Sequence, residues 1–159
     1  MSKRSFSKIT VVLAIAAIFV GTGLYAADVI ELDTKPYSKL ARPKVKFSHD
    51  KHAKDYAQAH PEFFKNGCGE CHHDDKNKPL KDLKETDKVE SCISCHKEPG
   101  QKPSKEKLSK KEKIKKYHAE AVHANCHGCH TSYVKAKKLK SKDKGYAPTK
   151  ARCVNCHKK

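Results

Sequence analysis

The sequence predicts a small domain made mostly of loops, with a few short α-helices, little β-structure and a core that its own side chains do not supply. The chain has no Trp, only 7% of its residues are aromatic, 33% are charged, and the mean hydropathy is −0.84. Such a chain cannot bury enough apolar area to offset the conformational entropy lost on folding. Eight cysteines and eleven histidines indicate what fills the centre instead.

The first 26 residues are expected to be a secretory signal peptide. A basic start is followed by an apolar run at residues 9–20 and by small residues that end in a cleavage site after Ala26. The alternative is a retained membrane anchor, but a spanning helix needs about 20 apolar residues, and residues 21–23 interrupt this run. We therefore expect a periplasmic chain of residues 27–159, one domain without stable membrane insertion.

In the first half of the mature chain, local patterns predict little regular structure. Residues 28–46 are expected to be extended or irregular, because Pro36 and Pro43 punctuate them. Residues 61–65 are predicted to form a short helix, which Gly67 closes. No strand is predicted.

The clearest helix is predicted to begin at Ser109, which forms a capping box with Glu112. It continues through an apolar stripe at helical spacing towards residue 126. The stripe consists of Ile114, Tyr117, Ala121 and Val122. Residues 100–107 and 135–150 are expected to be solvated loops.

The mature chain is strongly basic. The full sequence carries a formal net charge of +17, and losing the three basic residues of the expected signal peptide leaves +14. Because an exported protein rarely meets nucleic acid, this charge indicates acidic protein partners rather than DNA or RNA.

All eight cysteines fall into four CxxC pairs, and a histidine follows the second cysteine of every pair. The motifs are Cys68, Cys71 and His72; Cys92, Cys95 and His96; Cys126, Cys129 and His130; and Cys153, Cys156 and His157. CxxCH is the attachment motif of c-type haem. Two thiols at this spacing reach the two vinyl groups on one porphyrin edge, and the adjacent histidine binds the iron. The sequence therefore predicts four covalently bound haem c groups, with loops and short helices wrapped around them.

Other interpretations of the cysteines explain less of the pattern. A disulfide scaffold suits an exported chain, but it gives no reason for a histidine after each pair. Zinc ribbons use CxxC pairs without that histidine, and a thioredoxin-like pair comes singly in a βαβ context that is absent here.

The second axial ligand of each iron is expected to be histidine. Met1 is the only methionine and lies in the expected signal peptide, and all cysteines are used for attachment. Seven further histidines are available: His49, His52, His60, His73, His118, His123 and His127. Without axial Met, which raises the potential, such haems have low potentials. Irons with two histidines also leave no open position for a substrate, which favours electron transfer over catalysis.

The order of these motifs resembles that of the tetrahaem cytochrome c3 family, the class III c-type cytochromes of anaerobic sulfate- and metal-reducing bacteria. The resemblance spans residues 43–157 and includes a Val-x-Phe-x-His-x-x-His segment at residues 45–52 and a His-His pair ending the first motif. It implies a cytochrome c3-like fold. It also implies four axial pairs: His49 with His72, His73 with His96, His52 with His130, and His123 with His157.

The sequence departs from the commonest family pattern in three places. All four motifs are CxxCH, whereas many members have CxxxxCH at the second and fourth sites. The segment before Cys68 is longer than usual and contains His60. His118 is an alternative to His123 as the last distal ligand. His123 is preferred because it lies three residues before Cys126, the first residue of the third motif. His60 and His127 are expected to be surface or haem-edge histidines.

The expected function is that of a small periplasmic electron carrier, with no catalytic residues. The resemblance implies partners such as periplasmic hydrogenases, formate dehydrogenases and membrane-bound multihaem complexes. Lysine-rich tracts at residues 110–116 and 135–144 are expected to attract acidic partners. One alternative is a membrane-anchored tetrahaem quinol dehydrogenase, which would keep its N-terminal helix. Another is a dedicated reductase of metal ions or small oxyanions, which would keep one haem five-coordinate.

Overall fold

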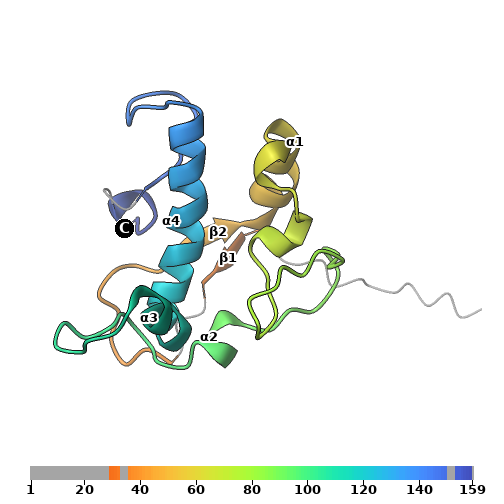
Figure 1. Ribbon diagram of the computed structural model, residues 1–159. Coiled ribbons are helices and arrows are strands. Elements are labelled where there is room, and N and C mark those ends of the chain that lie inside the picture. The colour runs from red at the N-terminus through yellow and green to blue at the C-terminus, as the bar shows by residue number, and fades with distance from the viewer. Residues whose placement is uncertain (1–28, 33–35, 150–152, 159) are drawn as a thin grey trace, which may run out of the picture.

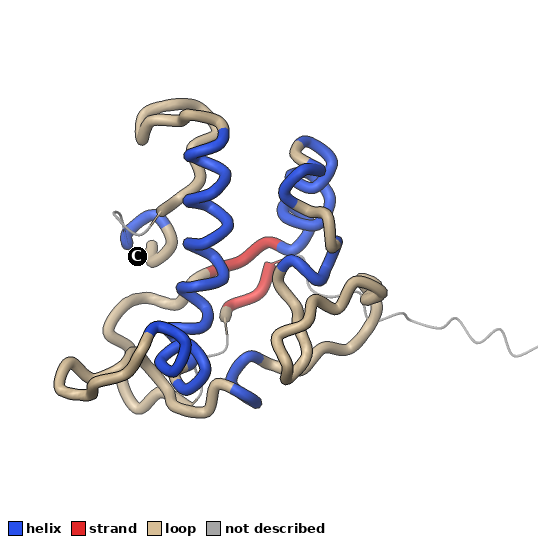
Figure 2. Tube along the Cα trace, in the orientation of Figure 1, coloured by secondary structure: helices blue, strands red, loops and turns tan. Residues whose placement is uncertain are grey.

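The computed structural model describes residues 29–32, 36–149 and 153–158, so the expected signal peptide lies outside the described residues. The elements are β1 (Val29–Glu31), β2 (Lys46–Ser48), the π-helical segment η1 (Lys51–Tyr56), α1 (Ala57–Ala59), the 3₁₀ segments η2 (Pro61–Phe63) and η3 (Gly67–Glu70), α2 (Cys92–Cys95), α3 (Lys110–Lys116), α4 (His118–Ala136) and the 3₁₀ segment η4 (Cys153–Asn155). Loops connect them (Figure 2). The predicted fold class, short helices and loops with little β-structure, is confirmed.

Helix α4 is the longest element, and the others are arranged around it (Figure 1). The lobe that contains η1, α1 and η2 stands beside the C-terminal half of α4. The two strands run between this lobe and α4, and α2 and α3 lie near the N-terminal end of α4. No helix in the described part of the chain is both long and apolar enough to span a membrane.

The strands β1 and β2 form an antiparallel pair in which Ile30 is opposite Phe47. The sequence does not predict this pair, because strands of three residues are too short to display an alternating pattern. The strand pair places Phe47 beside two of the predicted ligand histidines. The ring centre of Phe47 lies 4.8 Å from that of His49 and 4.4 Å from that of His52.

The helix predicted at residues 61–65 is a single 3₁₀ turn, η2, rather than a longer helix. Gly67 then takes a φ of +54°, in the left-handed region that glycine enters at little cost. Its N–H donates to the carbonyl of Phe64 at 3.0 Å, which closes the turn directly before the first CxxCH motif.

The predicted capping box at the start of α3 is confirmed. The Ser109 hydroxyl accepts from the N–H of Glu112 at 3.3 Å, and the Glu112 carboxylate accepts from the N–H of Ser109 at 2.8 Å. The helix does not continue unbroken into the third motif, however. It stops at Tyr117, whose backbone is extended with φ −101° and ψ 124°, and α4 begins at the next residue.

Tertiary contacts cause this break. The loop at residues 98–106 lies against the junction, where the N–H of Glu98 donates to Lys116 and its carbonyl accepts from the N–H of His118. The Tyr117 hydroxyl donates to the Glu106 carboxylate. These bonds occupy backbone groups that a continuous helix would use, so the local helical pattern is overridden.

The protein side chains form only a small core. Among the described residues, the buried apolar side chains are Tyr117 and Ala121, and the buried polar one is His118. No large side chain in the described ranges is less than 2% exposed. This agrees with the composition, which predicts that protein side chains alone do not supply the interior.

Candidate haem-binding sites

The predicted ligand histidines are brought together in pairs that join distant parts of the chain. Three pairs have ring centres 6.3, 6.1 and 6.2 Å apart: His52 with His130, His73 with His96, and His123 with His157. For the fourth expected pair, burial and then the charge of His49 lower the pKa of His72.

In the three measured pairs, the spacing of the rings fits one metal ion between them. A metal–imidazole nitrogen bond is about 2 Å long and the ring centre lies roughly 1 Å behind that nitrogen, so two imidazoles on opposite sides of one iron have centres about 6 Å apart. The three measured separations, 6.1–6.3 Å, match this value. Histidines in ordinary stacking contact can lie closer, as His123 and His127 do at 5.1 Å.

Backbone carbonyls orient five of the eight rings through Nδ1. The distances from Nδ1 to the carbonyl oxygen are 2.9 Å for His52 with Ser48, 2.7 Å for His73 with Asp74, 3.1 Å for His96 with Lys115, 2.7 Å for His130 with Pro148 and 2.7 Å for His157 with Pro43. A carbonyl can only accept, so Nδ1 carries the proton. The lone pair of Nε2 is then available to a metal, which is the arrangement found in metal-binding histidines.

The remaining rings have side-chain neighbours. Nδ1 of His123 lies 3.3 Å from the side-chain amide nitrogen of Gln101. His49 stands edge-on to Phe47. Burial is the main cause that lowers the pKa of both His52 and His72, which favours the neutral, metal-binding form of each ring.

A helical turn explains the spacing of the CxxCH motifs. In three of them, the N–H of the histidine donates to the carbonyl of the first cysteine. The distances are 3.0 Å from His72 to Cys68, 2.9 Å from His96 to Cys92 and 2.9 Å from His157 to Cys153. The third motif lies inside α4. Residues at i, i+3 and i+4 share one face of such a turn, so both thiols and the histidine point to the same side.

The four motifs converge around the centre of α4. The side-chain amide of Asn125 on α4 donates to the carbonyl of Cys71 in the first motif at 3.2 Å. Helix α2, which carries the second motif, contacts α4, and His123 of α4 lies beside His157 of the fourth motif. Burial is the main cause that raises the pKa of Cys71 to about 12 and that of Cys126 to about 11. Both are therefore thiols, rather than thiolates, at neutral pH. Attachment sites from all four motifs thus lie close together, as a compact cluster of haems requires.

Three histidines are not brought opposite a motif histidine. His118 is 5% exposed, and its Nδ1 lies 2.8 Å from the hydroxyl of Tyr37. His60 contacts Tyr133, and His127 stacks on His123 with an angle of 10° between the rings. Of the two alternatives for the last distal ligand, His123 rather than His118 lies beside His157.

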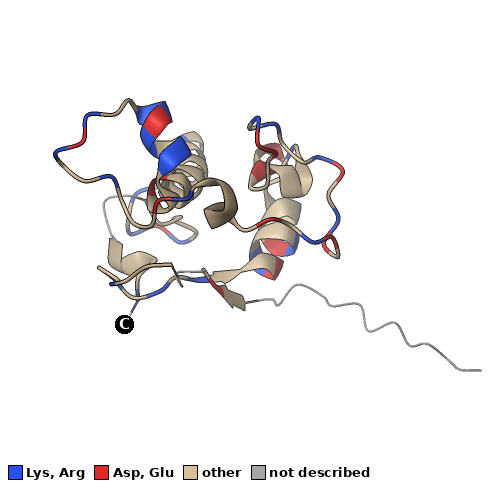
Figure 3. Ribbon diagram, turned by 90° about the horizontal axis from the view of Figure 1, so that it is seen from below, with Lys and Arg blue, Asp and Glu red and all other residues tan. Residues whose placement is uncertain are grey.

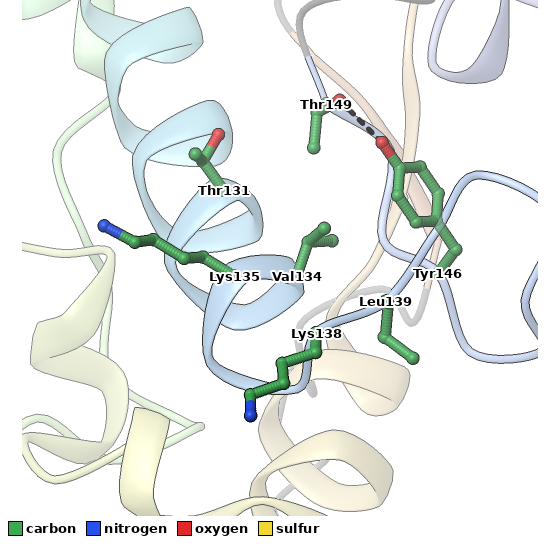
Figure 4. A pocket seen from close by; sticks show the side chains of 7 residues that line it. All are labelled: Thr131, Val134, Lys135, Lys138, Leu139, Tyr146 and Thr149. Carbon is green, nitrogen blue, oxygen red and sulfur yellow. Dashed lines mark hydrogen bonds between the residues drawn. The ribbon is translucent and has the colours of Figure 1, made fainter.

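Two cavities border the motifs. One, of about 540 Å³, lies between α4 and the loop that follows it (Figure 4), and its lining includes Thr131 and Thr149. These residues adjoin His130 and the carbonyl of Pro148 that accepts from it. The other, of about 380 Å³, is lined by residues that include Cys95 and Lys115. Both cavities therefore lie next to predicted haem ligands.

Lysines on α3 stand close to the second motif. The carbonyl of Lys115 accepts from His96, and its side chain lines the same cavity as Cys95. Lys110, Lys111 and Lys115 are exposed, and Figure 3 shows basic residues along α3. Part of the charge is neutralised, because the α3 lysines Lys113 and Lys116 form ion pairs with glutamates at 3.0 and 2.6 Å.

Comparison with known proteins places these motifs in a family. The model of the class III cytochrome C family matches residues 27–157. The high-molecular-weight cytochrome c of Nitratidesulfovibrio vulgaris strain Hildenborough is 28% identical over 138 residues, which are 86% of this chain and 19% of that protein. The crystal structure of the high-molecular-weight cytochrome c from Desulfovibrio vulgaris (Miyazaki F) in the presence of zinc ion is 25% identical with a TM-score of 0.42, and the match covers 89% of this chain and 22% of that chain. The chain thus spans about a fifth of the length of these relatives.

Gly69 and Gly128 each lie between the two cysteines of a motif and provide a matched test of the local packing. A Cβ on Gly69 would lie 3.0 Å from the backbone N and C atoms of Leu80, whereas a Cβ on Gly128 meets no described atom within 4 Å. We expect Gly69→Ala to lower the stability of the holoprotein by about 1–3 kcal/mol. Gly128→Ala should leave it unchanged or slightly raised, because Ala favours helix α4. Thermal unfolding followed by circular dichroism measures the difference, and equal midpoints for both variants would contradict the packing described.

Proposed function

Since the chain belongs to the class III cytochrome c family, electron carriers with covalently bound haem c, we propose that it holds four haems, each between two histidines. The observation that carries this proposal is the pairing of motif histidines with histidines from other segments. Three of the pairs have the ring separation that one iron requires.

Each haem is attached through the two cysteines of one motif and bound by the histidine of that motif together with one distal histidine. The distal ligands are His49, His73, His52 and His123 for the first, second, third and fourth motifs respectively. Bound haem c supplies a reversible one-electron couple at its iron. The carbonyl acceptors hold the imidazoles in place in both oxidation states, so little has to rearrange when the charge changes.

This ligand set suits a carrier better than an enzyme. Two histidines per iron leave no coordination position for a substrate. Met1 is the only methionine of the chain, so no axial methionine raises the potentials, and we propose that all four haems work at low potential.

We further propose that the carrier works in the periplasm, after cleavage near Ala26, and exchanges electrons with acidic redox proteins. Hydrogenases, formate dehydrogenases and membrane-bound multihaem complexes are the partner classes that the family resemblance implies. Support comes from the net charge, which stays strongly positive after the haem propionates are counted, and from the lysines of α3 beside the second motif. A positive surface next to a haem edge accelerates encounters with an acidic partner.

The ligand assignment is tested by replacing the two candidate distal histidines separately. We expect His123→Ala to convert one low-spin haem to a high-spin form, because its iron loses one imidazole. His118→Asn keeps a polar group near Tyr37 and should leave all four haems low-spin. Electron paramagnetic resonance of the oxidised holoprotein measures both. A high-spin signal from the His118 variant alone would reverse the assignment, and none from His123→Ala would remove His123 from the ligand set.

The partner proposal is tested with a triple variant of α3, Lys110→Gln, Lys111→Gln and Lys115→Gln. We expect the second-order rate of electron transfer from an acidic redox protein to fall about tenfold at low salt. The difference should vanish near 1 M salt, where the screening length is about 3 Å. A control with the same charge loss replaces Lys81, Lys84 and Lys88, which lie among acidic residues. Stopped-flow mixing gives the rates, and equal losses in the two variants would mean that net charge alone, not the α3 surface, guides the partner.

A further inference from the structure

The three measured histidine pairs differ in the angle between their rings. His52 and His130 are nearly parallel, with an interplanar angle of 19°, whereas the other two pairs stand at 71° and 77°. The carbonyls of Ser48 and Pro148 orient the two rings within their own parts of the chain. The angle between the two planes therefore also depends on contacts that hold the two ligand-bearing segments together. Such contacts exist between the lobe of η1, α1 and η2 and helix α4.

On the lobe, one row of residues leads from the ligand to the contact. The ring of His52 is 5.3 Å from that of Tyr56, at an angle of 83°. The N–H of His60 then donates to the carbonyl of Tyr56 at 2.8 Å, which continues the helical path. His60 is thus connected to His52 through two turns of helical backbone.

On α4, a second row faces the first. His130, Tyr133 and Lys137 stand at positions i, i+3 and i+7, which share one face of a helix. The ligand His130 is therefore one turn from Tyr133 and two turns from Lys137. The backbone of α4 is regular across these turns.

The two rows touch at three points. The Tyr133 hydroxyl is hydrogen-bonded to Nε2 of His60 at 3.2 Å, and the two ring centres are 5.0 Å apart. The ring of Phe63 stands edge-on to that of Tyr133 at 5.4 Å. Beyond them, the ammonium of Lys137 lies 2.9 Å from the Glu62 carboxylate.

The hydrogen bond and the ring contacts contribute more than the ion pair to holding the lobe against α4. Lys137 and Glu62 are 40% and 46% exposed, and an exposed ion pair contributes little because water screens it. Nδ1 of His60 is buried and has no hydrogen-bond partner within the described part of the chain. This nitrogen lies 4.0 Å from the Glu62 carboxylate, too far for a hydrogen bond. The ring of His60 is therefore hydrogen-bonded through Nε2, to Tyr133.

We propose that Tyr133 and His60 are positioning residues for the His52–His130 pair, a role that rests on the proposed function because it takes these two rings as ligands of one iron. The contact fastens η1 to α4 and so keeps the two imidazole planes nearly parallel. The angle between axial imidazole planes controls the splitting of the iron d orbitals. The contact thus sets the magnetic signature and the potential of one haem without touching it.

The test compares variants that remove the two partners of this hydrogen bond. Tyr133→Phe keeps the ring against Phe63 and His60 and removes the hydroxyl. His60→Phe keeps a ring and removes both nitrogens, including Nε2, which makes the bond. In redox titrations of the holoprotein followed by electron paramagnetic resonance, we expect each variant to lose the rhombic low-spin signal typical of parallel imidazoles and to shift the midpoint of that one haem. The double variant should be no worse than either single variant, because both remove the same bond.

Tyr37→Phe is the matched control, since it removes a tyrosine hydroxyl from another tyrosine–histidine pair, Tyr37 with His118. It should leave the rhombic signal and its midpoint unchanged. A rhombic signal and midpoint that also survive in Tyr133→Phe and His60→Phe would overturn the positioning role.

Failure of the proposed function gives a different result. Wild-type holoprotein lacking low-spin haem signals would refute bis-histidine ligation, and the positioning role with it. Four low-spin haems in the wild type, unaffected by the two variants, would refute the positioning role alone. Thermal unfolding of each variant separates a local change at one haem from a general loss of stability.

Discussion

A histidine ring that donates its Nδ1–H to a backbone carbonyl can present only Nε2 to a metal, and five of the predicted ligands are held in this way. The accepting carbonyls belong to loops, to the end of strand β2 and to the last turn of α3. The direction of each ring therefore depends on the path of the backbone. In turn, an iron between two rings would fix the segments that carry them. Ligand geometry and chain path support each other in this protein, and neither is specified by a hydrophobic core.

The small core makes this mutual dependence energetically necessary. With Tyr117 and Ala121 as the buried apolar side chains of the described ranges, protein contacts alone bury little apolar area. The porphyrin faces would supply the missing area. The crossed pairs would close long loops between distant segments, as between His52 in η1 and His130 in α4. We infer that folding and haem attachment are coupled, as metal binding and folding are in other small metal-dependent domains.

The sequence predicts the site better than it predicts the connecting structure. Motif spacing and family order identified histidines that the structure brings together in pairs, and the capping box at Ser109 marks the start of α3 correctly. The break at Tyr117 was not foreseeable from local pattern, because Glu98 and Glu106 cause it from a separate loop. The carbonyls that accept from the histidine rings are backbone groups, so no residue type in the sequence indicates where they are. The Tyr133–His60 contact joins residues 73 apart, and neither residue has a motif that indicates the other.

We propose that four haems are covalently bound to one exported chain, and an intact mass measured under denaturing conditions is the decisive test. The protein would be produced with haem-maturation machinery and then unfolded, since thioether-linked haem stays attached. We expect a chain that begins at residue 27 and carries four haem increments. A chain with no covalent haem, or with fewer than four when maturation is complete, would contradict it.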